Sequence, residues 1–426
     1  MPKSLPMTQT KSSNYLMSIT IIGILFFIFG FVTWLNSVLI PFLKQACELS
    51  NFQAYFVTLA FYISYFVMAI PSSYILKKTG FTKGMSVGLA IMGIGSLVFI
   101  PAAQMRSYPL FLLGLFTQGT GMTLLQTASN PYATILGPIE SAAKRISIMG
   151  ICNKVAGMIG IFVLVELLFS DATVLSEKIQ SLSGGELAAE LDALSSRVIA
   201  PYSVMAIVLF GLALMILKAP LPEINPEDTV SDSSEASQKK QSIFDFPHLI
   251  LGVICIFTYV GVEVIAIDTI GLYGQYQGFD ISTSSKFGIY SLIALVVCYI
   301  LGIAVMPKYI SQKNALISAT ILGIAFTSCA LISSGGISIT FVVLLSFANA
   351  LMWPCIWPLA LDKLGKFTKT GSALMIMGVA GGAILPLAYG AISDMTNRQF
   401  AYLIMIPLYL YILYFATKGH KVGKSA

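Results

Sequence analysis

Long hydrophobic segments alternate with short polar segments along the whole chain. A helix that spans a bilayer takes roughly 20 mostly apolar residues, and twelve segments are long enough. They lie near residues 15–41, 52–76, 84–104, 108–135, 146–169, 200–218, 247–273, 284–307, 313–334, 337–361, 371–393 and 399–417. We therefore predict an all-α membrane protein with twelve transmembrane helices.

The composition agrees with this pattern and narrows the class of function. Of the 426 residues, 56% are hydrophobic and only 10% are charged, and the mean hydropathy is +0.84. A soluble globule would carry about 25% charged residues. The two histidines and six scattered cysteines offer no CxxC pair or catalytic triad, and no Walker-type glycine loop is present. We expect neither an enzyme nor an ATP-driven pump, and no organic cofactor.

The basic residues fall on alternate loops and so predict an orientation. One side, with both termini and the even-numbered loops, carries eighteen Lys and Arg residues, the other side carries six, and Lys154 lies within a helix. Because cytoplasmic loops hold the excess of positive charge, both termini should be cytoplasmic. The net charge of +6 is thus a topology signal, and we expect no nucleic-acid partner.

A polar segment divides the chain near its middle. Residues 219–246 are rich in Pro, Ser and charge, which is typical of a flexible linker. We expect a six-helix half at 1–218, a cytoplasmic linker at 219–246 and a second six-helix half at 247–426. Aligning Gly30 with Gly261 superimposes the first helices of the two halves and places Ser37 on Asp268. Two such halves would hold a substrate near the middle of the membrane.

Three charged residues lie deep within the predicted spans: Lys154, Glu263 and Asp268. Each costs about 2.5–3.5 kcal/mol at the bilayer centre, so each needs a partner or a watery cavity. Glu263 and Asp268 point about 140° apart on one helix and cannot share a site unless that helix breaks. Lys154 could pair with Glu263 or with Asp362. A purely structural role for these groups remains an alternative to a role in ion coupling.

Neutral polar residues and tryptophans also lie within or at the ends of the spans. The polar set comprises Asn36, Gln126, Thr127, Asn130, Asn153, Gln275 and Asn349. Trp353 and Trp357 are four residues apart and share one helix face, beside prolines that favour a bend. Amide side chains can form hydrogen bonds with hydroxyl groups, and an aromatic ring can pack against C–H groups. This combination of residues therefore suits a sugar. Anchoring at the membrane interface is the alternative for the tryptophans.

Several motifs carry a resemblance to a known family. They are NSVLIP at 36–41, NFQAYFVTLAFYISYF at 51–66, PAAQ at 101–104, LLQTASNPYATILGP at 124–138, YVGVEV at 259–264 and GGAILPLAYGAISD at 381–394. Together they resemble the fucose–galactose–glucose symporter family of the major facilitator superfamily, and in particular its glucose/galactose branch. The resemblance implies two pseudo-symmetric six-helix halves and sugar uptake by alternating access.

Two positions depart from the acids of the family's proton-coupled fucose permease. Ser37 and Gln126 stand where that permease has acidic residues, and neither can carry a proton. Asp268 aligns with Ser37 in the internal repeat, so we expect the coupling carboxylate to have moved to the second half. Some members of the glucose/galactose branch use sodium, and a sodium site at Asp268 is our hypothesis.

These inferences give one set of expected roles. We expect a monomeric, multi-pass protein of a bacterial inner membrane that transports glucose, galactose or mannose with a cation, Na⁺ first. The expected sugar contacts are Asn36, Gln126, Asn130, Asn153, Glu263, Gln275, Asn349 and Trp353. The expected ion-coupling residues are Asp268, Glu263, Ser37, Thr269 and Lys154, with Asp268 as the Na⁺ ligand. Proton symport, uniport, a proton-driven drug exporter and a sugar sensor remain alternatives.

Overall fold

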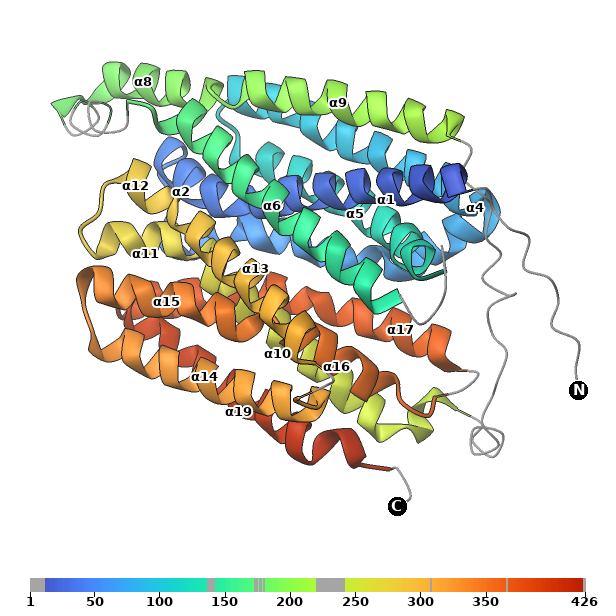
Figure 1. Ribbon diagram of the computed structural model, residues 1–426. Coiled ribbons are helices and arrows are strands. Elements are labelled where there is room, and N and C mark those ends of the chain that lie inside the picture. Colours follow the sequence, from blue (N-terminus) through green and yellow to red (C-terminus); the bar gives the residue numbers. More distant parts are fainter. Residues whose placement is uncertain are drawn as a thin grey trace, which may run out of the picture.

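The computed structural model describes residues 12–135, 142–171, 175, 178, 181–219, 242–306, 309–364 and 367–423. Within these residues the structure is entirely helical (Figure 1). Most of the predicted linker, residues 220–241, lies outside the described part of the chain.

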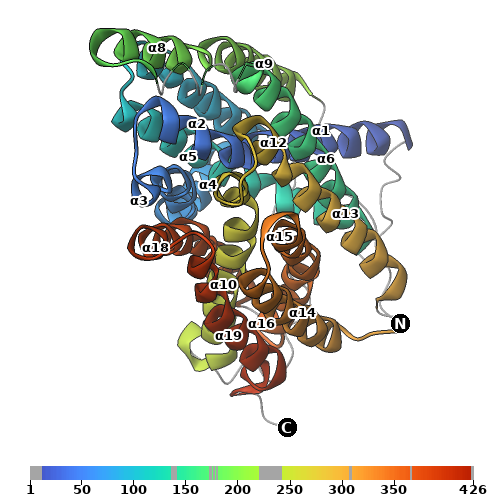
Figure 2. The ribbon, with the colours of Figure 1, turned by 90° about the vertical axis from the view of Figure 1, so that its left-hand side faces the viewer.

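The helices form two groups that face each other (Figures 1 and 2). The N-terminal helices are α1 (Ser12–Trp34), α2 (Asn36–Ala46), α3 (Asn51–Ala54), α4 (Phe56–Gln104), α5 (Tyr108–Ile135), α6 (Ala142–Phe169), α8 (Gly184–Ser196) and α9 (Ile199–Lys218). The C-terminal helices are α10 (Pro247–Asp268), α11 (Ile270–Tyr276), α12 (Ile281–Ser285), α13 (Phe287–Val305), α14 (Gln312–Ile332), α15 (Gly335–Asn349), α16 (Met352–Leu361), α17 (Thr368–Met377), α18 (Gly381–Met395) and α19 (Met405–Thr417). Short 3₁₀ turns occur at Ile243–Asp245, Gly378–Ala380, Phe400–Ile404 and Gly419–Lys421.

The twelve predicted spans are confirmed, with one merger. Ten helical segments of the described chain are long and apolar enough to cross a membrane. One of them includes α4, a helix of 49 residues that contains two predicted spans. Gly80, with φ of 75°, separates its two arms, since this left-handed conformation favours glycine. When the two arms of α4 are counted as separate spans and the 28-residue α5 is added, the ten segments become the twelve predicted spans.

Several spans are interrupted partway along their length. The first span breaks at Leu35, between α1 and α2, and the seventh breaks at Thr269, between α10 and α11. The tenth span breaks between α15 and α16. Backbone irregularity is tolerated at membrane depth where it is buried in protein or lines a cavity. The breaks at Leu35 and Thr269 place Asn36 at the start of α2 and Asp268 at the end of α10.

Small residues allow the helices within each group to approach closely. A Cβ atom at Gly30 of α1 would overlap the backbone of Asn153 in α6. In the same way, a Cβ at Gly381 of α18 would overlap the backbone of Phe257 in α10. Without a hydrophobic driving force between helices in lipid, such close packing is the main source of their association. These contacts hold α6 against α1 and α10 against α18.

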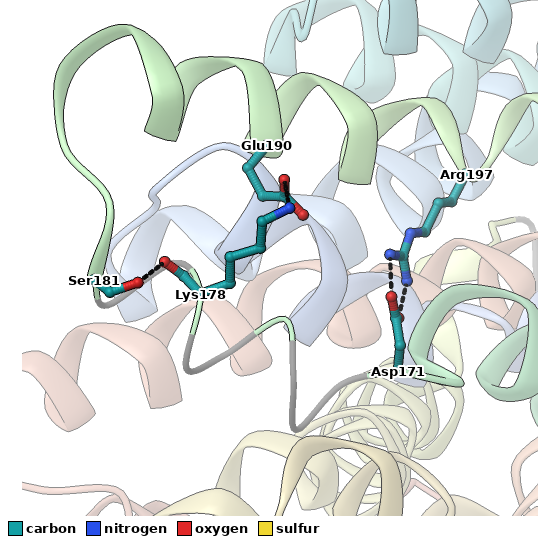
Figure 3. Close-up of polar contacts among 5 residues, drawn as sticks. All are labelled: Asp171, Lys178, Ser181, Glu190 and Arg197. Carbon is teal, nitrogen blue, oxygen red and sulfur yellow. Dashed lines mark hydrogen bonds and ion pairs between the residues drawn. The ribbon is translucent and has the colours of Figure 1, made fainter.

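We call the end of the bundle that carries α3, α8 and α12 the distal end; α1 begins and α19 ends at the opposite, proximal end (Figures 1 and 2). At the distal end α8 is held by ion pairs between Lys178 and Glu190 and between Arg197 and Asp171 (Figure 3). Hydrogen bonds from Arg197 lower the pKa of Asp171, so this pair stays charged. These two ion pairs hold α8 against the segment that precedes it.

Candidate functional site

A buried ion pair joins the two helix groups. Lys154 Nζ of α6 lies 3.6 Å from Glu263 Oε1 of α10, and the side chains are only 10% and 12% exposed. Lys154 also lies over the Trp34 ring, 4.0 Å from its centroid, as a cation–π contact. Of the two partners predicted for Lys154, the structure selects Glu263. The backbone carbonyl of Asp362 instead contacts His248 Nε2 at 2.9 Å.

Two amide side chains of the N-terminal helices are held by aromatic residues of the same helices. Trp34 Nε1 donates to Asn153 Oδ1 at 3.1 Å, which holds the indole beneath the lysine. Gln126 Nε2 of α5 donates to the Tyr65 hydroxyl at 3.0 Å. Both amides are partly exposed although they lie in the middle of spanning helices. Partial exposure of polar groups at this depth fits a watery cavity between the helix groups.

Aromatic side chains of the C-terminal helices are linked to Glu263 through Tyr259. Trp353 and Trp357 of α16 stack with centroids 5.2 Å apart and planes at 24°, so the predicted shared face is confirmed. Tyr259 lies 6.2 Å from Trp353 and interacts electrostatically with Glu263. Both tryptophans are partly exposed. Rings of this kind offer a flat apolar surface to a ligand's C–H groups.

Asp268 occupies a separate and drier place at the end of α10. Its side chain is fully buried, and neither carboxyl oxygen has a hydrogen-bond partner among the described residues. Tyr55, Tyr62 and Glu263 are near enough to interact with it electrostatically. A buried carboxylate without a protein cation beside it is unfavourable unless it binds a proton or a metal cation. The break in the helix follows Asp268, so Glu263 and Asp268 remain on one continuous helix.

The two hydroxyl groups predicted to take part in ion coupling already donate to backbone carbonyls. Ser37 Oγ donates to the Trp34 carbonyl at 2.8 Å. Thr269 Oγ1 donates to the Ile265 carbonyl at 2.6 Å and contacts the Tyr402 hydroxyl at 2.7 Å. Each hydroxyl oxygen retains lone pairs for a cation. Asn36 is also buried, and its Nδ2 has no partner in the described structure.

The remaining predicted sugar contacts are spread more widely. Asn349 at the end of α15 is buried, and its Oδ1 accepts a hydrogen bond from Tyr409 at 2.8 Å. Gln275 lies in α11 at the distal end, away from the Lys154–Glu263 pair. The side chain of Asn130 lies outside the described residues. Intervening residues link three of the predicted contacts to Glu263: Trp34 and Lys154 link Asn153, Tyr259 links Trp353, and Tyr65 with Tyr62 links Gln126.

The two helix groups are joined at the distal end by polar contacts. Asp394 of α18 accepts hydrogen bonds from the backbone amides of Asn51 and Phe52, at 3.2 and 2.8 Å, and so caps α3. Arg398 Nη2 donates to Asn51 Oδ1 at 2.7 Å. Lys286 also pairs with Glu166 across the groups. These contacts close the distal end.

Several residues of this region were not predicted. Tyr62 and Tyr65 lie in the FYISYF part of a motif that was noted only for its resemblance, yet Tyr65 holds Gln126. Their spacing of three residues places both on one helix face and could have identified them. The cap by Asp394 gives no sequence signal, since it joins residues 342 positions apart.

Comparisons with known proteins agree with this architecture. A sequence profile of the Major Facilitator Superfamily matches residues 22–386. A glucose/galactose transporter of Brucella abortus is 33% identical over 97% of this chain and 97% of its own, and an L-fucose-proton symporter of Escherichia coli is 27% identical over 90% and 88%. The crystal structure of FucP, a Major Facilitator Superfamily transporter in the outward conformation, has a TM-score of 0.70 and 26% identity, and the match covers 95% of this chain and 98% of that one.

The predicted fold and the predicted resemblance are both confirmed by these matches. The superfamily profile covers most of the spanning helices, and the similarity to the transporters extends over nearly the whole chain. The chain belongs to the Major Facilitator Superfamily, whose members are transporters and not enzymes, and within it to the fucose–galactose–glucose symporter family.

Proposed function

We propose that this protein is a secondary active transporter of hexoses of the glucose, galactose or mannose type. The observation that carries the proposal is the cluster of side chains linked to Glu263 through shared partners: the amides of Asn153 and Gln126 and the ring of Trp353, which with the carboxylate combine amides, a negative group and an aromatic face. The name of the Brucella relative supports glucose and galactose as substrates. The amide groups favour a sugar over the apolar substrates of a drug exporter.

Alternating access would use the two helix groups as rocking halves, residues 1–218 and 247–426, joined by the linker at 219–246. The cluster draws residues from both halves, so a sugar bound there would bridge them. The contacts of Asp394, Arg398 and Lys286 at the distal end would have to break before sugar could enter from that end.

Coupling to a cation is assigned to Asp268. Its burial and its unpartnered oxygens support binding of a positive ion. Oxygen atoms of Ser37, Asn36 and Thr269 are the hard ligands that Na⁺ prefers, and Na⁺ is our leading candidate. Proton symport through Asp268 or Glu263 is the alternative, favoured by the names of the fucose-proton symporters among the relatives. Uniport ranks third.

Counterflow in proteoliposomes tests substrate and ion together. Labelled glucose, galactose, mannose and fucose are offered to vesicles preloaded with unlabelled hexose, while the Na⁺ concentration and pH are varied independently. We expect overshoot with glucose, galactose or mannose, and gradient-driven uptake that follows Na⁺. Absence of counterflow with every hexose would overturn the proposal. Uptake that follows the pH gradient alone would replace Na⁺ by H⁺.

The orientation is also a proposal: a bacterial inner membrane with both termini and the proximal end in the cytoplasm, and the distal end outside. Single cysteines can be introduced into a cysteine-free variant, within 219–246 and within 170–199. A membrane-impermeant maleimide should label the first only after the membrane is opened and the second in intact cells. The reverse pattern would contradict the orientation. The protein should purify as a monomer.

A further inference from the structure

A hydrogen bond within the N-terminal helix group links Tyr65 of α4 to Gln126 of α5. Gln126 Nε2 donates to the Tyr65 hydroxyl at 3.0 Å. Tyr65 is only 3% exposed, whereas the Gln126 side chain is partly exposed. Because Tyr65 has so little free surface, any effect it has on a ligand must be exerted through the glutamine.

The ring of Tyr65 is held in place by two other rings of α4. Tyr62 stacks with it at a centroid distance of 6.2 Å and an interplanar angle of 25°, and Phe61 meets it edge-on at 6.4 Å. Phe61 and Tyr62 precede Tyr65 by one helical turn, so all three residues lie on one side of the helix. Packing of the ring on both neighbours fixes where its hydroxyl lies, and the hydroxyl is therefore a fixed point to which an amide can bind.

Close packing of α4 against α5 brings Gln126 to that point. A Cβ atom at Gly119 of α5 would overlap Ser64 Oγ and the Phe61 carbonyl oxygen of α4, so a glycine allows the two helices to approach this closely. Gln126 follows Gly119 by nearly two helical turns and so lies on the same face of α5. Both helices belong to the N-terminal group, and a rocking movement of one group against the other would leave the hydrogen bond intact.

This hydrogen bond decides which end of the Gln126 amide is free. Nε2 is engaged by Tyr65, while Oε1 has no hydrogen-bond partner among the described residues and is not buried. The free end is therefore an acceptor, to which a sugar hydroxyl can donate. The last torsion of a glutamine side chain has only broad preferences. Without the Tyr65 hydroxyl, the amide could turn and present either end.

We propose that Tyr65 is a positioning residue that turns the amide oxygen of Gln126 toward the bound hexose and so sharpens the selection of sugars with a hydroxyl at one particular carbon. The inference rests on the proposed function, in which Gln126 contacts the sugar. A site built to bond a hydroxyl rejects an analogue that lacks it, because a polar group of the site is then left unpaired. An amide that cannot turn finds no other partner, so fixing it increases this penalty.

Selectivity, and not only affinity, should change in Tyr65→Phe. Deoxy and deoxyfluoro analogues of the hexose that gives counterflow, glucose first, compete with the labelled sugar for exchange in proteoliposomes. In the parent protein one deoxy analogue should bind about 10- to 100-fold more weakly than the hexose, and Gln126→Ala should abolish this preference. The deoxyfluoro analogue at the same carbon should bind as weakly, because fluorine cannot donate to Oε1. Tyr65→Phe should reduce the preference about 3- to 10-fold, as expected for one lost hydrogen bond, and leave the maximal exchange rate within about twofold of the parent's.

Two further variants serve as controls. Tyr411→Phe removes a hydroxyl that donates to the Leu251 carbonyl at 3.1 Å within the C-terminal group, and it should keep the affinity and the selectivity of the parent protein. Tyr65→Phe/Gln126→Ala should bind the hexose no more weakly than Gln126→Ala alone, because a positioning residue has no effect once the residue it positions is gone. Selectivity is a ratio of two binding constants, so it does not depend on how much of a variant is folded.

The outcomes separate this inference from the proposed function. If the parent protein exchanges no hexose, both are overturned. If it exchanges hexose but Tyr65→Phe keeps its preference, or weakens the hexose and every analogue equally, the inference alone is overturned, because the tyrosine would at most shape the cavity. Unchanged binding in Gln126→Ala would leave hexose transport standing and remove Gln126 from the sugar site, and the inference with it. A deoxyfluoro analogue that binds like the hexose would also overturn it, since Nε2 would then face the sugar.

Discussion

Replacing Asp268 by asparagine is expected to abolish ion-driven accumulation of hexose while leaving sugar exchange at least partly intact. The substitution keeps the side-chain volume and removes the negative charge from a fully buried position. Exchange needs alternating access but no net movement of an ion, so it should survive the loss of the ion site. Accumulation is measured as uptake of labelled glucose into proteoliposomes with an inward Na⁺ gradient, and exchange as counterflow in the same preparation.

Linkage adds a second requirement to this prediction. An ion that helps the sugar to bind must itself be bound more tightly, by the same factor, when the sugar is present. Na⁺ should therefore lower the apparent dissociation constant of the sugar in the parent protein and have no effect in Asp268→Asn. Acidification at constant Na⁺ should compete with the metal ion, since a proton and Na⁺ would share one carboxylate.

A matched variant excludes a general effect of charge removal. Asp171→Asn makes the same change in an exposed ion pair with Arg197 (Figure 3), and it should leave accumulation unchanged. If sugar affinity in the parent protein is indifferent to Na⁺ while uptake follows the pH gradient, the sodium site is wrong and Asp268 carries a proton. Full accumulation in Asp268→Asn would remove this residue from coupling altogether.

The second large effect is expected at the Lys154–Glu263 pair. Lys154→Met leaves the Glu263 carboxylate without its cation at a position where its side chain is only 12% exposed. Breaking one side of a buried pair costs about 3 kcal/mol, whereas removing both charges is often nearly neutral. The double variant Lys154→Met/Glu263→Gln should therefore recover most of the stability that Lys154→Met loses. Thermal unfolding of the purified proteins in detergent measures this difference.

Sugar binding should respond differently from stability in the same variants. Since Glu263 is a proposed hydroxyl partner, the double variant should remain weak in binding glucose even though its stability returns. Lys286→Met is the comparison, because it breaks an exposed pair with Glu166 and should cost less than about 1 kcal/mol. The single variant Glu263→Gln completes the comparison. If the stability losses of Lys154→Met and Glu263→Gln simply add up in the double variant, Lys154 and Glu263 do not interact energetically.

The sequence by itself determined the class, the spans and most of the central residues. Spanning helices must satisfy their backbone groups internally, so the hydrophobic pattern specifies them without help from the rest of the fold. Charged residues are so unfavourable in lipid that Lys154, Glu263 and Asp268 could be identified individually. The helical repeat placed Trp353 and Trp357 on one face, because residues four apart on a helix are neighbours.

Only the tertiary structure decided which of these residues meet. The choice of Glu263 over Asp362 as the partner of Lys154 depends on how the two helix groups dock, because Lys154 of α6 and Glu263 of α10 come from different groups. The cap of α3 by Asp394 and the ion pair of Lys286 with Glu166 also join residues from opposite halves of the chain. Such contacts arise where two separately predictable groups of helices dock. Their geometry depends on side-chain packing across the interface, which no local sequence pattern encodes.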